Sequence, residues 1–103
     1  MPFRLHTHLT FFYLLDNVLF ENQLHPDLID TAARISHAQG DTVSGNELFE
    51  FLVQKTKGEY AIYLYLKYLT ETKQYELAKR IYSGSGLTFP NHRNEIDDLR
   101  SVW

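Results

Sequence analysis

Apolar residues recur every three or four positions along most of the chain, which is the period of an α-helix. No strand-like alternation outweighs this period, so the sequence predicts an all-α bundle of short helices joined by short connections. The pattern places five helices, over Phe11 to Asn22, Pro26 to just before Gly40, Ser44 to Gly58, Tyr60 to Thr72 and Gln74 to Tyr82.

Two helix starts carry local signals in the sequence. Pro26 suits the first turn of a helix, and the residue before a proline avoids the helical region, so the chain should break at His25. The run Ser44-Gly45-Asn46-Glu47 fits the capping box, in which the first and fourth residues bond each other's backbone N–H groups. The sequence therefore predicts that one helix begins at Pro26 and the next at Ser44.

The C-terminal segment has a different composition from the predicted bundle. Ser83-Gly84-Ser85-Gly86 has the composition of a flexible linker. Beyond it, apolar residues at helical spacing predict an amphipathic tail that docks on the bundle or binds a partner. These residues are Ile96, Leu99, Val102 and Trp103. The predicted domains are therefore a helical bundle over residues 1–83 and a linker with an amphipathic tail over residues 84–103.

Composition narrows the class of protein. The chain has 103 residues, enough for one domain, and its 44% hydrophobic and 15% aromatic content excludes wholesale disorder. It has no Cys, which excludes disulfides, thiolate metal sites and a cysteine nucleophile. No apolar run approaches the roughly 20 residues of a membrane span, and the first residues lack a signal-peptide pattern. We therefore expect a cytoplasmic protein with no membrane insertion.

Charge is distributed unevenly along the chain. The net charge is −3, too small to favour nucleic-acid binding without a basic stripe. Between residues 11 and 45 five acids accompany one base, whereas between residues 46 and 82 six bases accompany five acids. This distribution predicts one acidic and one basic face, and no nucleic-acid partner.

Catalytic and metal-binding motifs are not evident in the sequence. His6 and His8 are two residues apart, whereas two ligands on one helix face would be three or four apart. No nucleophile elbow, phosphate-binding loop or HExxH motif is present. We therefore expect no enzymatic activity, no metal and no cofactor.

The predicted helix over Tyr60 to Thr72 is apolar on nearly all sides. One face holds Ala61, Ile62, Tyr65, Leu66 and Leu69, and these residues are expected in the core. The opposite face includes Tyr60, Tyr63 and Leu64 beside charged residues, a composition enriched at protein interfaces. This aromatic patch is either an interface or a surface covered by the first helix or by the tail through Trp103.

Two stretches together resemble the caspase recruitment domain (CARD), a branch of the death-fold superfamily of six-helix interaction modules. Residues 13–24, YLLDNVLFENQL, are similar to the family's second helix, which reads roughly L-L-D-x-L-L-x-x-x-x-L. Residues 58–81, GEYAIYLYLKYLTETKQYELAKRI, align without a gap beside G-x-x-A-F-x-x-F-L-x-A-L-x-x-T-G-x-x-x-L-A-x-x-L. Lys73 stands where that pattern has glycine. The resemblance covers roughly residues 11–83.

The resemblance implies an antiparallel death-fold bundle of five to six helices with an abbreviated first helix, near Pro2 to Thr10. It also implies an adaptor that acts by homotypic binding in apoptotic or innate-immune signalling, with another death-fold protein or itself as partner and with possible homo-oligomers. In CARDs an acidic surface of one domain meets a basic surface of its neighbour. The matching acids are Asp16, Asp27 and Asp30, and the matching bases are Arg4, Lys55 and Lys57.

Two other functions remain open at the level of sequence. The short first helix could leave half of the interface missing, in which case the domain would cap assemblies as a regulator or decoy. Alternatively, an unrelated helical domain could bind a partner groove through Ile96, Leu99 and Trp103.

Overall fold

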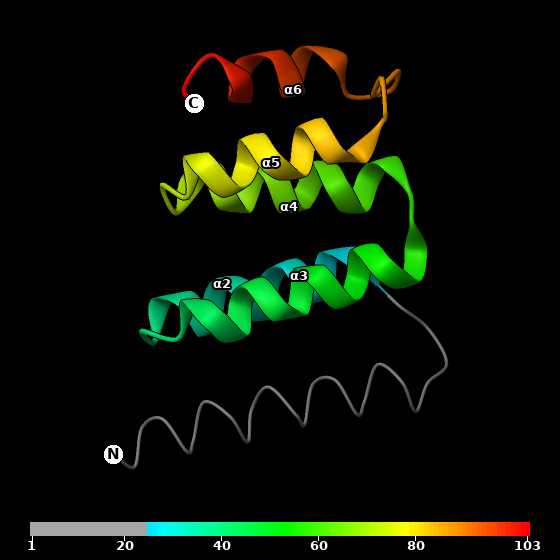
Figure 1. Ribbon diagram of the computed structural model, residues 1–103. Coiled ribbons are helices and arrows are strands. Elements are labelled where there is room, and N and C mark those ends of the chain that lie inside the picture. The colour runs from blue at the N-terminus through cyan, green and yellow to red at the C-terminus, as the bar shows by residue number, and fades with distance from the viewer. Residues whose placement is uncertain (1–24) are drawn as a thin grey trace. The chain divides into compact units, whose positions relative to one another are not determined.

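We describe residues 25–103 of a computed structural model of the chain, shown in Figure 1. These residues form five helices and no strand: α2 (Pro26–Ala38), α3 (Thr42–Thr56), α4 (Glu59–Glu71), α5 (Tyr75–Ser85) and α6 (Arg93–Arg100). The all-α prediction is confirmed for this part of the chain. The helices predicted over residues 2–10 and 11–22 lie outside it. Contacts divide the chain into two compact units, Met1–Thr56 and Lys57–Trp103, and each is described by itself.

The described part of the first unit is a helical hairpin. Helix α2 begins at Pro26, as predicted, and packs against α3. Gly40 adopts a φ of 86° in the short connection, and its N–H donates to the carbonyl of His37 at 2.9 Å. A left-handed residue at this position ends a helix and satisfies its last carbonyls. The hairpin's buried apolar residues are Ile29, Ala32, Ala33, Leu48, Phe49 and Leu52.

The start of α3 differs from the prediction. The helix begins at Thr42 and not at Ser44, because Asp41 supplies the cap three residues before Ser44. One oxygen of the Asp41 carboxylate accepts the backbone N–H of Ser44 at 3.1 Å, and the other accepts the Ser44 hydroxyl at 2.7 Å. Asp is among the strongest capping residues, so this cap outcompetes the predicted capping box. Ser44 is therefore a buried residue inside the helix.

The second unit is organised around α4, which packs against α5 and α6. The predicted core face of α4 is confirmed, since Ala61, Ile62, Tyr65, Leu66 and Leu69 are all buried. Three further residues, from α5, the connection that follows it and α6, are fully buried in the same unit: Ala78, Phe89 and Ile96. A surface helix would leave one face exposed, whereas α4 is the central element of its unit.

The prediction of a flexible linker over Ser83-Gly84-Ser85-Gly86 is wrong. Helix α5 continues to Ser85, and Gly86 follows it with a left-handed φ of 66°. The Ser85 hydroxyl donates to the carbonyl of Tyr82 at 2.8 Å and accepts the N–H of Leu87 at 3.2 Å. Serine and glycine here form the last turn and the cap of a helix, where glycine is favoured for its positive φ. The predicted domain boundary at residue 83 thus lies inside the second unit.

Candidate functional site

The acidic residues predicted for a partner surface differ in their surroundings. Asp27 lies in the first turn of α2 and is exposed. Asp30 is half-buried, and its carboxylate accepts from the Arg34 guanidinium at 3.0 Å, an ion pair that offsets its charge. Asp16 lies outside the described residues. Of the two acids on α2, Asp27 is the more exposed one.

Two apolar residues of α2 are exposed as well. Leu28 is 40% exposed and Ile35 is 42% exposed. Their spacing of seven residues is two helical turns, which places both side chains on one side of the helix. We call Asp27, Leu28 and Ile35 the α2 surface.

The predicted basic residues lie near the end of α3. Lys55 is in the last turn of α3, exposed, with its ammonium 5.7 Å from the centre of the Phe51 ring. Lys57 is also exposed and has a left-handed φ of 49°. Arg4 lies outside the described residues. Since α2 and α3 form an antiparallel hairpin, Asp27 and Lys55 lie at the same end of it.

An acidic strip on α3 was not predicted as a surface. Val43 is 67% exposed, and Glu47 and Glu50 are exposed further along the helix. Intervals of four and three residues bring the three side chains to one side of α3. We call these three residues the α3 strip. The sequence assigned Glu47 to a capping box, so its surface role was missed.

The predicted aromatic patch is largely covered. Leu64 is only 6% exposed, so the prediction that it belongs to an outer face is wrong, because α4 has helices packed on more than one side. The ring of His92 stacks on Tyr63 at a centroid distance of 4.6 Å and on Tyr60 at 5.7 Å. Tyr60 keeps 40% of its surface exposed. The C-terminal segment thus covers part of this patch through His92, whereas Trp103 contacts Thr70 and Tyr82.

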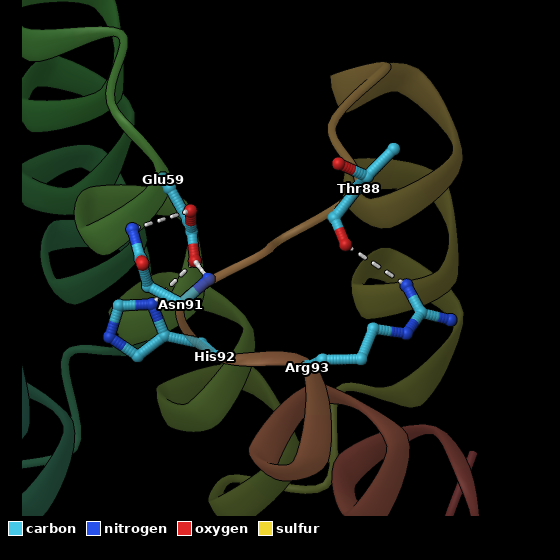
Figure 2. A network of polar contacts seen from close by, with 5 residues as sticks. All are labelled: Glu59, Thr88, Asn91, His92 and Arg93. Atoms are coloured by element: carbon cyan, nitrogen blue, oxygen red, sulfur yellow. Dashed lines mark hydrogen bonds and ion pairs between the residues drawn. The ribbon is translucent and has the colours of Figure 1, made fainter.

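A polar clasp holds the beginning of α6 to the beginning of α4 (Figure 2). Oε2 of Glu59 accepts the backbone N–H of Asn91 at 2.9 Å and lies 2.7 Å from Nδ1 of His92. Oε1 of Glu59 accepts from Nδ2 of Asn91 at 3.4 Å. A carboxylate oxygen accepts hydrogen bonds, so this contact is a hydrogen bond when Nδ1 of His92 carries the proton. Next to the clasp, the Arg93 guanidinium donates to the carbonyl of Thr88 at 3.1 Å.

The predicted tail residues pack within their own unit. Ile96 is fully buried, whereas Leu99 and Trp103 are half-buried. The indole N–H of Trp103 donates to the Thr70 hydroxyl at 2.8 Å. The tail was predicted either to dock on the bundle or to bind a partner, and the structure shows it docked on helices of its own unit.

An open pocket of about 320 Å³ lies beside the end of α5 and is lined by Lys79, Tyr82, Ser83, Arg100 and Trp103. The Arg100 guanidinium lies over the Tyr82 ring, 4.7 Å from its centre. The Trp103 ring meets Tyr82 edge-on at 5.7 Å. Helical spacing alone groups Lys79, Tyr82 and Ser83, but their meeting with Arg100 and Trp103 depends on tertiary packing. No local pattern in the sequence therefore indicates this pocket.

Two histidines of the described residues, His37 and His92, have separate surroundings. Nδ1 of His37 lies 2.8 Å from the Thr42 hydroxyl, and His92 belongs to the clasp. His6 and His8 lie outside the described part of the chain. Among residues 25–103, no group of three or more His, Asp or Glu side chains is placed to hold a metal ion. Within the same range, none of the helices combines the length and the apolar character needed to cross a membrane.

Comparisons of the chain with protein-family models, with curated proteins and with solved structures find no match. Function is therefore inferred from the surfaces of the two units. These are the α2 surface and Lys55 in the hairpin, the α3 strip, and the pocket beside α5.

Proposed function

We propose that the chain is a CARD-like interaction module that associates with domains of its own kind, a second copy of itself among them. The α2 surface carries this proposal, because Leu28 and Ile35 remain exposed beside the acidic Asp27. Protein interfaces combine an apolar centre with a polar rim, and exposed apolar side chains grouped on one face are unfavourable in water unless a partner covers them.

The opposite charges of the hairpin supply the complementarity that a homotypic contact requires. Asp27 of one copy faces Lys55 of the next in this proposal, with Lys57 nearby in the chain. Exposed ion pairs contribute only about 0 to 1 kcal/mol each, so the apolar residues provide most of the affinity. The charges set the orientation of the partners and raise the association rate. Such a module acts as an adaptor, in apoptotic or innate-immune signalling if it shares the role of CARDs.

A backbone feature supports the CARD resemblance independently of these surfaces. Lys73 occupies the position at which the CARD pattern has glycine, and its φ is 62°, in the left-handed region. The N–H of Gln74 donates to the carbonyl of Leu69 at 2.8 Å, which closes α4 with Lys73 as the left-handed cap residue. Glycine is the residue that adopts this conformation without steric cost. The turn after α4 thus has the geometry that a glycine would favour.

Light scattering behind a sizing column tests the proposal. The mass of the full chain should grow with protein concentration, and high salt should weaken this growth because it screens exposed charges. Asp27→Lys should weaken association about tenfold, which corresponds to about 1.4 kcal/mol. Asp98→Lys is the matched control, since it changes the net charge equally at an exposed position on α6. A monomer at every concentration, or equal effects of the two variants, would contradict the proposal.

A further inference from the structure

The pocket beside α5 holds two cations whose own ion pairs are exposed. Lys79 pairs with Glu76 at 3.3 Å, and Arg100 pairs with Asp97 at 3.8 Å. The four side chains are between 45% and 85% exposed. Exposed pairs of this kind are weak and screened by salt, so a carboxylate from outside can replace either partner. The pocket is therefore open to an anionic ligand.

The aromatic walls of the pocket determine which anionic ligand suits it. The guanidinium carbon of Arg100 lies over the Tyr82 ring, 4.7 Å from its centre, so the ring supports the cation from one side. Tyr82 and Trp103 offer apolar surface beside it, and Ser83 adds a hydroxyl. A volume of about 320 Å³ accommodates a few side chains. The matching ligand is a segment that presents carboxylates together with an apolar side chain.

We propose that this pocket binds the α3 strip of a second copy of the chain. The strip presents two carboxylates, Glu47 and Glu50, which match the two cations of the pocket in number and sign. Val43, at 67% exposed, supplies apolar surface for the aromatic walls. Glu47 and Glu50 are neighbours on the helix surface, which lets both reach one pocket.

This inference rests on the proposed homotypic function and adds a second contact to it. Each copy offers one pocket and one strip, which are different surfaces, so the contact is heterologous and can extend from copy to copy. The Asp27 and Lys55 contact uses neither of them. The two contacts can therefore be removed separately by substitution.

Trp103 makes the pocket directly observable, because it is the chain's single tryptophan and lines the pocket. The unaltered chain is the fluorescent partner, and a Trp103→Phe chain, which has no tryptophan, is titrated into it as the source of the strip. We expect a saturable change in Trp103 emission. The double substitution Glu47→Lys and Glu50→Lys in the titrated chain should weaken binding at least tenfold. Lys79→Gln with Arg100→Gln in the fluorescent chain should do the same.

Matched controls separate this contact from general charge effects and from misfolding. Glu95→Lys with Asp98→Lys in the titrated chain changes the net charge equally and should leave the titration unchanged. The milder pair Glu47→Gln and Glu50→Gln should weaken binding while the circular dichroism spectrum stays that of the unaltered chain. Unchanged binding by either Glu47/Glu50 double variant would overturn the inference.

Light scattering on the same mixtures distinguishes failure of this inference from failure of the proposed function. Association that is lost with Asp27→Lys but kept with the Glu47 and Glu50 variants, without any change in Trp103 emission, overturns the pocket contact alone. No association in any mixture overturns the homotypic function together with this inference. Loss of the emission change with the Glu47 and Glu50 variants, but not with the control pair, supports the inference.

Discussion

The α2–α3 hairpin and the unit of α4, α5 and α6 differ in where their exposed apolar side chains lie. The hairpin leaves Leu28, Ile35 and Val43 exposed beside acidic residues. In the second unit Tyr60 and Val102 are exposed, whereas Leu64, on the expected outer face of α4, is buried. Helix α4 packs against both α5 and α6. An amphipathic period shows which side of a helix is apolar, but the number of neighbouring helices decides how much of it is covered. In the described part of the chain, the hairpin combines exposed apolar residues with neighbouring exposed acids, and this combination makes it a candidate for binding.

Two isoleucines test this difference with the largest expected effect. Ile96 on α6 is fully buried, whereas Ile35 on α2 is 42% exposed. Ile96→Ala should lower the free energy of unfolding by about 2 to 4 kcal/mol, because it removes buried methyl groups and leaves a cavity. Ile35→Ala should lower it by less than about 1 kcal/mol and should instead weaken self-association. Urea unfolding and light scattering measure the two quantities, and equal stability losses would contradict the comparison.

The clasp between Glu59 and the segment before α6 should have an intermediate effect. The Glu59 and His92 side chains are 16% and 23% exposed, so their contact is partly shielded from water. Glu59→Ala should lower the free energy of unfolding by about 1 to 3 kcal/mol, since it removes charge-assisted bonds and leaves their donors without an acceptor. Glu95→Ala, at an exposed position on α6, is the control and should have little effect. A loss for Glu59→Ala no larger than for the control would show that the clasp does not hold α6.

Substitutions at the left-handed residues that follow α2 and α4 should have smaller effects on stability, and the two effects should be of opposite sign. Gly40 and Lys73 take the same structural position, with φ values of 86° and 62°. Gly40→Ala should cost about 1 kcal/mol through backbone strain alone, since no atom lies within 4 Å of the added Cβ. Lys73→Gly should raise the free energy of unfolding by up to about 1 kcal/mol, because glycine adopts the left-handed φ without strain. The greater conformational entropy that glycine gives the unfolded chain offsets part of this gain. Thermal melting measures both, and a lower melting temperature for Lys73→Gly would contradict this reading of the turn.

Local signals in the sequence predicted the helices well. Pro26, Gly40 and the apolar period of α4 fixed element types and most of the boundaries, because caps and periodicity act over a few residues. The errors have tertiary or competing local causes. Asp41 displaced the predicted cap at Ser44, and the serines and glycines after Tyr82 formed a helix end where a linker was expected.

The candidate surfaces were less predictable than the helices. Asp27 and Lys55 were predicted from the resemblance to CARDs and are exposed, but their function stays a prediction. The pocket was missed because Arg100 and Trp103 reach Tyr82 only when the C-terminal segment docks on its own unit. Surfaces built from segments far apart in the chain leave no local signature.

A charge exchange between two variants tests homotypic association most directly. Asp27→Lys and Lys55→Glu should each weaken self-association, since each places like charges face to face in the proposed contact. When mixed in equal amounts, the two variants should associate again, because each altered charge then meets its opposite on the other chain. Light scattering that shows heavier species in the mixture than in either variant alone is the predicted result. A mixture that behaves as the sum of its separate components would contradict the account.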